Sequence, residues 1–444
     1  MRAMLASVCA MPCVLVATMP TLAQEPIEPL FVPVGVESGL VWGGDPSARP
    51  ADEMGRVAIY GHTVEVNGSA WMRVDFGSVE LGDAPAGGPP TIVRLTSLRD
   101  GAEQRLEARH FEQWRRMSAF FNGGAVRVEI LSDPMAEPSS ITIDRVLVQP
   151  GYVLPLDPGL GDSICGTTDD RQLSDDPRVA RGWSASGSAN CTAWIITDCM
   201  KCVLAAGHCA FVQVHFNNPL STPGGVPVMP HPDDQYAIDL TSEQEQASGV
   251  GQDWYYAGAF ANPNTGLTPF EAQGDGFDLA TSIPAVTGQA IRVTGHGITS
   301  APVDPTWFRA QKTHTGPFVE FTGSSLRYAM DTTSGNSGSP VIDETSGEAI
   351  GIHTHGGCSA DGGANAGTAV TYTALQNALA APRGVCANPC PADLTCDGEL
   401  NIFDFLEFSN YFATGDARAD LDGDGQLTLL DFLAYQNDFA MGCP

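Results

Sequence analysis

The distribution of cysteines limits the architecture of this chain more than any other feature. Of the 12 cysteines in 444 residues, none lies between Gln24 and Pro150. Cys9 and Cys13 fall in an apolar N-terminal stretch, and the others form an even set: Cys165, Cys191, Cys199, Cys202, Cys209, Cys358, Cys386, Cys390, Cys396 and Cys443. An even set is typical of proteins that keep disulfides in an oxidising compartment. The clustering predicts three units along the chain.

The first 23 residues have the features of a secretory signal. Arg2 supplies a positive charge, residues 4–16 are largely apolar, and Thr21-Leu-Ala23 offers the small residues of a cleavage site. A membrane anchor is the alternative, but the apolar run is shorter than a bilayer-spanning helix. We therefore expect a secreted protein, extracellular or attached to the cell surface, with no transmembrane segment after signal removal.

The chain carries a large excess of acidic residues. It has 52 Asp and Glu against 22 Lys and Arg, a formal net charge of -30. Nucleic acids and anionic membranes both need a basic protein face. The charge balance therefore argues against either as a partner.

Residues 24–150 predict a β-sandwich that serves as an accessory domain. Short stretches such as Ala125–Ile130 and Ile141–Val148 alternate apolar and polar residues, and Gly, Pro and Asp separate them. This alternation is typical of antiparallel strands in two packed sheets. No cluster of catalytic residue types stands out there. The sequence leaves open whether this part is a removable pro-segment or a permanent module.

The C-terminal segment contains an internal repeat. The block Asp393–Asp404 recurs as Asp420–Asp431, and an apolar stretch follows each block. Each block places oxygen-bearing side chains where an EF-hand loop carries its ligands, with a glycine at the sharp turn. We therefore expect two structural Ca²⁺ sites, with Asp at the last position instead of the usual Glu. The expected ligands are Asp393, Thr395, Asp397, Asp404, Asp420, Asp422, Asp424 and Asp431.

The duplicated loop, followed each time by a short apolar helix, resembles a dockerin domain over residues 387–444. A dockerin binds a cohesin, largely through two positions near the end of each loop. Here those positions hold Ile402, Phe403, Leu429 and Leu430, which are apolar instead of the common hydroxyl-bearing type. The resemblance implies Ca²⁺ binding more directly than it implies the partner. A cohesin-like or cell-surface partner is a hypothesis.

Two segments of the central unit carry residue types that amide hydrolysis needs. The reaction requires a nucleophile, a base for its proton and donors for the oxyanion. Ser337 lies between glycines in Gly335-Asn-Ser-Gly, so a substrate carbonyl can approach it. A tight turn there can direct the N–H groups of Gly335 and Ser337 to one point. His208 follows an apolar strand and precedes Cys209.

These segments resemble the trypsin-like, chymotrypsin-fold serine proteases, nearest to the bacterial glutamyl and lysyl endopeptidases. The resemblance covers roughly residues 160–383 of an expected protease domain of 151–386. It implies two six-stranded β-barrels with the active site between them, and a triad in the order His, Asp, Ser. Asp278 is favoured as the triad acid because an aliphatic strand follows it. Asp253, which opens an aromatic run nearer to His208, is the rival.

The resemblance also implies two disulfides. Cys191 and Cys209 match the pair across the first barrel, and Cys165 with Cys358 would tie the start of the unit to its last strands. The remaining close pair either bonds to itself or forms half of a metal site. Zinc is not expected, because no second cysteine pair of suitable spacing lies nearby. That close pair is Cys199 and Cys202.

The cues for cleavage specificity contradict each other. Thr332 and His353 match the positions that receive a glutamate side chain in the glutamyl endopeptidases. Asp331 lies where trypsin carries the aspartate that attracts Arg or Lys, and a buried carboxylate there would repel a glutamate. The sequence leaves an acidic and a basic preference open, and Asp331 could also be a structural turn residue.

The expected fold is mainly β: a β-sandwich, a double-barrel protease domain and a small α-helical Ca²⁺-binding domain. The expected function is a secreted serine endopeptidase that cleaves proteins or peptides through an acyl-enzyme on Ser337. His208 would act as general base and Asp278 would orient it. The alternative is a catalytically silent protease-fold protein that binds or adheres through its Ca²⁺-binding tail.

Overall fold

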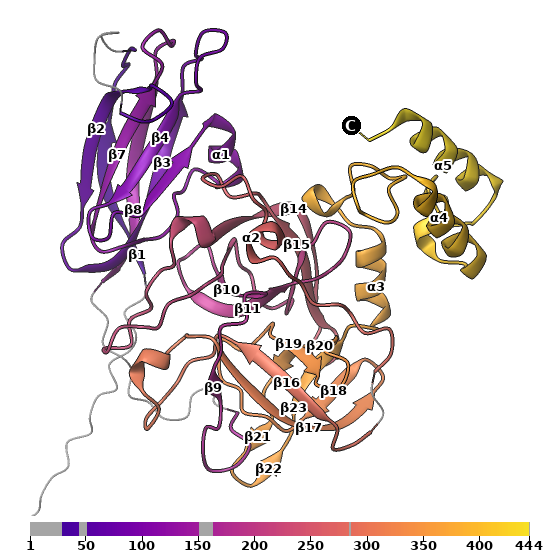
Figure 1. Cartoon of the computed structure of the whole chain (residues 1–444). Helices are drawn as coiled ribbons and strands as arrows, with labels where there is room; N and C mark the ends of the chain where they lie inside the picture. The colour runs from indigo at the N-terminus through magenta and orange to yellow at the C-terminus, as the bar shows by residue number, and fades with distance from the viewer. Residues whose placement is uncertain (1–28, 44–50, 151–162, 284–285, 444) are drawn as a thin grey trace, which may run out of the picture.

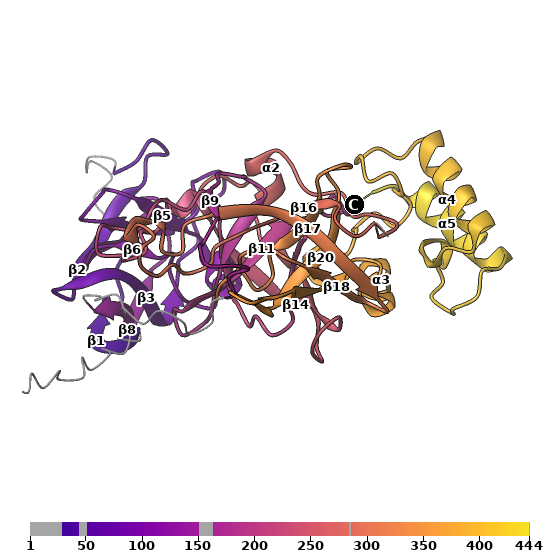
Figure 2. The ribbon, with the colours of Figure 1, turned by 90° about the horizontal axis from the view of Figure 1, so that it is seen from below.

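The structure is a computed structural model that describes residues 29–43, 51–150, 163–283 and 286–443. The expected signal peptide, residues 1–23, lies outside the described residues. Figures 1 and 2 show the N-terminal strands and the two C-terminal helices at opposite ends of the molecule, with two barrels between them. No helix in the described part of the chain is long and apolar enough to cross a membrane.

The N-terminal unit, residues 29–150, consists of two four-stranded antiparallel sheets. Side chains that alternate along the strands fill the space between them, as Val126, Val128 and Ile130 of β7 do. The first sheet has the order β1 (Leu30–Glu37), β8 (Ser140–Pro150), β3 (Ser69–Glu80) and β6 (Phe121–Asn122). The second has the order β2 (Val57–Glu65), β7 (Ala125–Ser132), β4 (Ile92–Ser97) and β5 (Glu103–Leu106).

Two antiparallel barrels follow. The first closes in the order β10 (Val179–Trp183), β11 (Ala189–Ile195), β12 (Val203–Ala205), β15 (Asp253–Ala259), β14 (Gln235–Ala247) and β13 (Gln213–His215). The second runs β16 (Ala290–Gly295), β19 (Pro340–Asp343), β20 (Ala349–His355), β23 (Asn365–Ala369), β18 (Ser325–Tyr328) and β17 (Lys312–Thr322), and pairing of β16 with β17 closes it. Short β9 (Gln172–Leu173) adds to β17, and β21 (Cys358–Ser359) pairs with β22 (Gly362–Gly363). The expectation of a mainly β chain with two six-stranded barrels is confirmed.

The helices are short and lie at the edges of this framework. The tail has two of them, and each begins at a capping box, on Asn401 and on Thr428. Phe408 and Tyr435 stack in the small core between these helices, with ring centroids 4.6 Å apart. In the described part of the chain the helices are α1 (Ala108–Gln113), α2 (Pro269–Gln273), α3 (Thr373–Ala380), α4 (Ile402–Thr414) and α5 (Leu429–Met441).

Five disulfides connect the described residues. Two of them are the pairs that the resemblance implied, Cys165–Cys358 and Cys191–Cys209. The others are Cys199–Cys396, Cys202–Cys386 and Cys390–Cys443.

The expectation that Cys199 and Cys202 pair with each other or form half of a metal site is wrong. Each thiol is bonded to a cysteine near the C-terminus, at a sequence separation of 197 and 184 residues respectively. A sulfur in a disulfide is not a thiolate ligand. The two bonds instead fasten the segment between β11 and β12 to the tail and to the linker before it.

The N-terminal unit packs directly on the first barrel. Trp71 and Phe120 contact Trp183 of β10, with ring centroids 5.9 and 4.7 Å away. The buried side chain of Gln235 accepts a hydrogen bond from the Phe120 N–H at 2.8 Å and donates one to the Phe120 carbonyl at 2.9 Å. A buried aromatic cluster with paired polar groups makes this a fixed contact between the two units.

Candidate active site

His208 lies against the carboxylate of Asp253. The neighbouring antiparallel strands β12 and β15 bring them together, because His208 comes just after β12 and Asp253 opens β15. Nδ1 of His208 is 2.6 Å from Oδ2 of Asp253, and the His208 N–H donates to Oδ1 at 3.1 Å. The Asp253 side chain is 3 % exposed and that of His208 is 42 % exposed. A buried carboxylate thus fixes the ring and leaves its outer edge open to a substrate.

The preference for Asp278 is corrected by this geometry. Asp278 is exposed, and its Oδ1 accepts a hydrogen bond from the Thr197 hydroxyl at 2.5 Å. Its backbone carbonyl accepts from the Ala349 N–H, so it belongs to the connection into the second barrel. The pairing of β12 with β15 decides which acid lies beside His208, and it places Asp253, the first residue of β15, there.

Ser337 lies in a turn between β18 and β19 that packs on both barrels. Its carbonyl accepts from the Thr192 N–H at 2.8 Å, and the Gly338 N–H donates to the His353 carbonyl at 2.7 Å. Gly338 has φ +89°, and a Cβ there would lie 2.0 Å from the Thr192 carbonyl and 3.1 Å from the Ala206 nitrogen. The turn therefore sits against the segment that leads into His208. Among the described residues no hydrogen bond joins the Ser337 hydroxyl to His208, and such bonds often tighten only when substrate binds.

The same turn contains two backbone donors that have no acceptor among the described residues. The Ser334 carbonyl accepts from the Ile298 N–H, and the Asn336 carbonyl accepts from the Ser339 N–H, each at 2.9 Å. In a trans peptide the C=O and N–H point in opposite directions. The N–H groups of Gly335 and Ser337 therefore point away from those partners, and neither has an acceptor among the described residues. This is the donor pair that an oxyanion needs.

The buried guanidinium of Arg171 makes hydrogen bonds that fix the turn of Ser337. Nη1 donates to the Thr333 hydroxyl at 2.7 Å and to Oδ1 of Asn336 at 3.1 Å, and Nη2 donates to the Ile298 carbonyl at 2.9 Å. Asp169 pairs with the same guanidinium at 2.6 Å. Sequence reasoning missed this residue, because an Arg two positions after an Asp carries no motif of its own.

The carboxylate of Asp331 accepts hydrogen bonds from the backbone of the segment that precedes the first barrel. Its side chain is buried, and its two oxygens accept from the Cys165 N–H and the Asp170 N–H, each at 2.7 Å. Nδ1 of His314 accepts from the backbone N–H of Asp331 at 2.9 Å. Both carboxylate oxygens of Asp331 are therefore hydrogen-bonded inside the protein.

His353 is buried beside the turn of Ser337 and keeps one ring nitrogen available. Its Nδ1 is 2.7 Å from the hydroxyl of Tyr328, and burial raises the pKa of that phenol. The hydroxyl has no other acceptor among the described residues, so it donates to Nδ1. The proton of the ring then lies on Nε2, which has no partner among the described residues. Burial, with the nearby His355 and His208, lowers the pKa of His353 to about 3. Thr332 is also buried, and its hydroxyl accepts from Asn365 at 3.0 Å.

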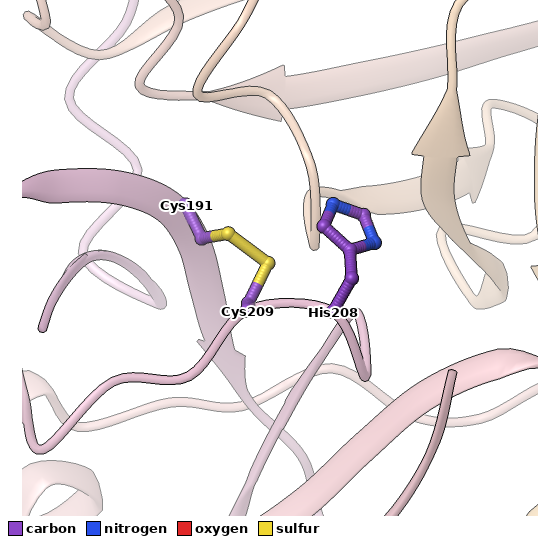
Figure 3. Close-up of side chains that lie close together, drawn as sticks. All are labelled: Cys191, His208 and Cys209. Atoms are coloured by element: carbon purple, nitrogen blue, oxygen red, sulfur yellow. A yellow bond between two sulfur atoms is a disulfide. The ribbon is translucent and has the colours of Figure 1, made fainter.

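The disulfide Cys191–Cys209 lies beside His208 (Figure 3). The three side chains come close together, but both sulfurs are consumed by the disulfide. They therefore offer no metal ligand. The bond joins β11 to the segment just after His208 and so braces the backbone that carries the imidazole.

The tail loops differ in how far their carboxylates converge. In the second loop, oxygens of Asp420, Asp422 and Asp431 lie within 4.8 Å of one another, and Oδ1 of Asp420 is buried without a hydrogen-bond partner. This all-oxygen set fits Ca²⁺, which prefers hard oxygen ligands. In the first loop Asp404 accepts from the Thr395 hydroxyl at 2.8 Å, and Thr395 brings no charge. Asp393, Asp397 and Asp424 bond backbone N–H groups of their own loops.

Comparisons with known proteins give structural likenesses at low identity. No family model matches the chain, and no curated protein matches it. A solved Glu endopeptidase in complex with MPD is 18 % identical with a TM-score of 0.37, and the match covers 49 % of this chain and 97 % of that one. The serine protease AL20 from an extremophilic microorganism is 16 % identical with a TM-score of 0.36, covering 46 % and 96 %. The protease Anisep from Arthrobacter nicotinovorans is 16 % identical with a TM-score of 0.36, covering 47 % and 96 %.

Proposed function

We propose that the chain is a secreted serine endopeptidase that cleaves protein or peptide substrates through an acyl-enzyme on Ser337. The observation that carries the proposal is the 2.6 Å contact of His208 with the buried Asp253, beside a turn that holds Ser337 and two free backbone donors. Five disulfides are in keeping with an extracellular location.

Each group has a role that follows from its position. His208 takes the proton of Ser337 through Nε2 as the hydroxyl attacks the substrate carbonyl, and Asp253 holds Nδ1–H and stabilises the imidazolium. The N–H groups of Gly335 and Ser337 bind the oxyanion of the tetrahedral intermediate. His208 then gives its proton to the leaving amine, and water hydrolyses the acyl-enzyme by the same steps.

The preferred residue before the scissile bond is proposed to be acidic. Asp331 supports this choice because both of its oxygens already accept backbone hydrogen bonds. His353 supports it because Nε2–H is a donor that can bind a carboxylate, and a bound carboxylate would favour the charged imidazolium.

Labelling with a fluorophosphonate probe tests the proposed activity. The wild-type chain should form a covalent adduct, and Ser337→Ala should form none. Ser334→Ala, a change at an exposed serine of the same turn, is the matched control and should label as wild type does. A folded wild type that does not label would favour the alternative, a catalytically silent binding protein.

We also propose that the tail binds Ca²⁺ and docks on a cohesin-like or cell-surface partner. The converging carboxylates of Asp420, Asp422 and Asp431 support the cation. The exposed apolar residues at the starts of α4 and α5 support a partner surface: Ile402, Phe403, Leu429 and Leu430.

Calorimetric titration of the full chain with Ca²⁺ tests this second proposal. The heat of binding should be lost in Asp420→Asn and kept in Asp438→Asn, which removes the same charge from α5. A chain that takes up no Ca²⁺ would overturn the metal site, whereas the labelling experiment judges the protease separately.

A further inference from the structure

A cavity of about 440 Å³ lies between the N-terminal unit and the first barrel. One wall comes from β1, β3, β8 and the segment after α1, and the other comes from the β10–β11 loop, β13 and β14. Its size is within the range of small-ligand sites. It lies outside the candidate active site, although Val212 and Gln213 in its wall follow closely on His208 in the chain.

The lining of this cavity is positively charged in a strongly acidic protein. Arg73, Arg115 and Arg145 line it, against a single carboxylate, that of Asp75. Asp75 is already paired with Arg145 at 2.6 Å. Three of the chain's 22 basic residues thus meet in one cavity, in a chain of net charge -30. Three guanidinium groups against one carboxylate leave the lining of the cavity with a net positive charge.

Three donors of the lining are buried without a partner. Nη1 of Arg73, Nε1 of Trp114 and Nε2 of Gln213 have no hydrogen bond among the described residues. Arg73 is 2 % exposed, and among the described residues its side chain makes one hydrogen bond, from Nε to the Ser118 carbonyl at 2.6 Å. Buried cations and buried donors are costly unless an acceptor meets them. Each of these three atoms is a donor, and each lacks an acceptor among the described residues.

Arg115 of the lining lies in a strained backbone conformation. Arg115 and Arg116 follow α1 with φ values of 56° and 57°, in the left-handed region that non-glycine residues rarely adopt. Hydrogen bonds hold this turn, from the Arg116 N–H to the Phe111 carbonyl and from Nη1 of Arg116 to the Gly77 carbonyl, each at 2.7 Å. The guanidinium of Arg115 has no carboxylate partner among the described residues. Strained turns of this kind gather at ligand sites.

We propose that this cavity binds a small oxyanion, a carboxylate or a sulfate or phosphate group, between the N-terminal unit and the first barrel. Arg73 and Arg115 supply the charge, because guanidinium groups meet oxyanions with two parallel hydrogen bonds. Trp114 and Gln213 supply neutral donors from the two walls. The bound anion contacts both units and so stabilises their contact. The site is independent of proteolysis and stands if the proposed function fails.

Thermal unfolding of the full-length Ser337→Ala chain tests the site, since this variant cannot digest itself. Sodium sulfate and sodium glutarate are the probes, and sodium chloride at equal ionic strength is the reference. We expect a saturable rise in Tm beyond that of chloride, about 5 °C at a hundredfold excess over Kd. A rise with glutarate alone assigns the site to a carboxylate, such as an acidic peptide side chain, and a rise with sulfate alone assigns it to a tetrahedral anion.

Substitutions locate the effect. Arg115→Gln changes an exposed side chain and should abolish the rise in Tm. Arg145→Gln should weaken binding, so that the Kd obtained from the rise in Tm increases at least tenfold. Arg327→Gln, which removes the same charge from β18 of the second barrel, should leave it unchanged. The proposal is overturned if neither probe exceeds chloride, or if the rise survives in Arg115→Gln.

Discussion

Arg171 donates a hydrogen bond to the side-chain oxygen of Asn336, the residue immediately before Ser337, at 3.1 Å. The same guanidinium reaches Thr333 and the Ile298 carbonyl, and the carboxylate of Asp169 neutralises it. A segment that precedes the first barrel thus positions the turn that carries the proposed nucleophile.

Arg171→Lys should lower kcat more than it lowers affinity. A lysine keeps the charge but cannot make the forked contacts of a guanidinium, so the donor pair of Gly335 and Ser337 loses its fixed direction. We expect kcat to fall about tenfold or more with KM nearly unchanged. Steady-state kinetics with active-site titration measure this. Arg178→Lys is the matched control, because Arg178 pairs with Asp176 at the same spacing and does not touch the turn. Equal losses in both variants would mean that Arg171 is only structural.

Asp253→Asn should reduce kcat by about four orders of magnitude, because the amide leaves His208 in the wrong tautomer. Asp278→Asn should stay within about threefold of wild type, since among the described residues the Asp278 side chain bonds to Thr197 and not to His208. Single-turnover kinetics on the same peptide compare the two variants. A large loss in Asp278→Asn with a small one in Asp253→Asn would contradict the assignment.

His353→Gln should weaken cleavage after glutamate by about 100-fold in kcat/KM, because the ring donor that meets the carboxylate is lost. Asp331→Asn should lower stability and leave the preference for Glu over Lys unchanged, because its oxygens bind the backbone of residues 165 and 170. Paired peptides that differ only in Glu or Lys before the cut give the ratio. A wild type that prefers Lys, with the preference lost in Asp331→Asn, would reverse the proposed specificity.

The free energy of unfolding should fall as the pH drops from about 6.5 towards 3. Burial, together with Arg181 and Lys312, lowers the pKa of His296 to about 3, from an ordinary value of 6.5. The unfolded chain takes up this proton within that window while the folded chain does not, so acid favours unfolding. Urea titrations at several pH values measure the slope. His296→Gln should flatten it, and His231→Gln, at an exposed histidine, should not.

The chain should label with the fluorophosphonate probe without losing its N-terminal unit. The turn of Ser337 is held by internal groups, among them Arg171 and the Ser163 bridge to Thr332. The N-terminal unit is fixed by buried contacts of Phe120 with Gln235. Intact mass of the labelled species decides the matter. Labelling confined to a shortened species would mean that residues 24–150 are a pro-segment after all.

The sequence could predict those parts of the site that lie in short local motifs. Ser337 and His208 each lie in such a motif, and the motif can be recognised without knowledge of the fold. The two barrels follow from the resemblance carried by the same motifs. The alternation of apolar residues likewise indicated paired strands in residues 24–150.

The remaining parts depend on which strands become neighbours. Asp253 meets His208 only because β12 pairs with β15, and a motif match further along the chain favoured Asp278 instead. Cys199 finds its partner in the tail, at a sequence separation that no spacing rule limits. Arg171 acts through residues far away in the chain, so nothing local marks it.

The bond Cys199–Cys396 ties the C-terminal tail, and Cys202–Cys386 ties the linker before it, to the first barrel. A force on the tail can pass through the Cys199–Cys396 bond into the segment between β11 and β12, in addition to the peptide that joins the units. A single cut in that peptide by another protease would leave the tail attached. If the tail is held by a surface, covalent bonds therefore keep the barrel that carries His208 close to that surface even after such a cut.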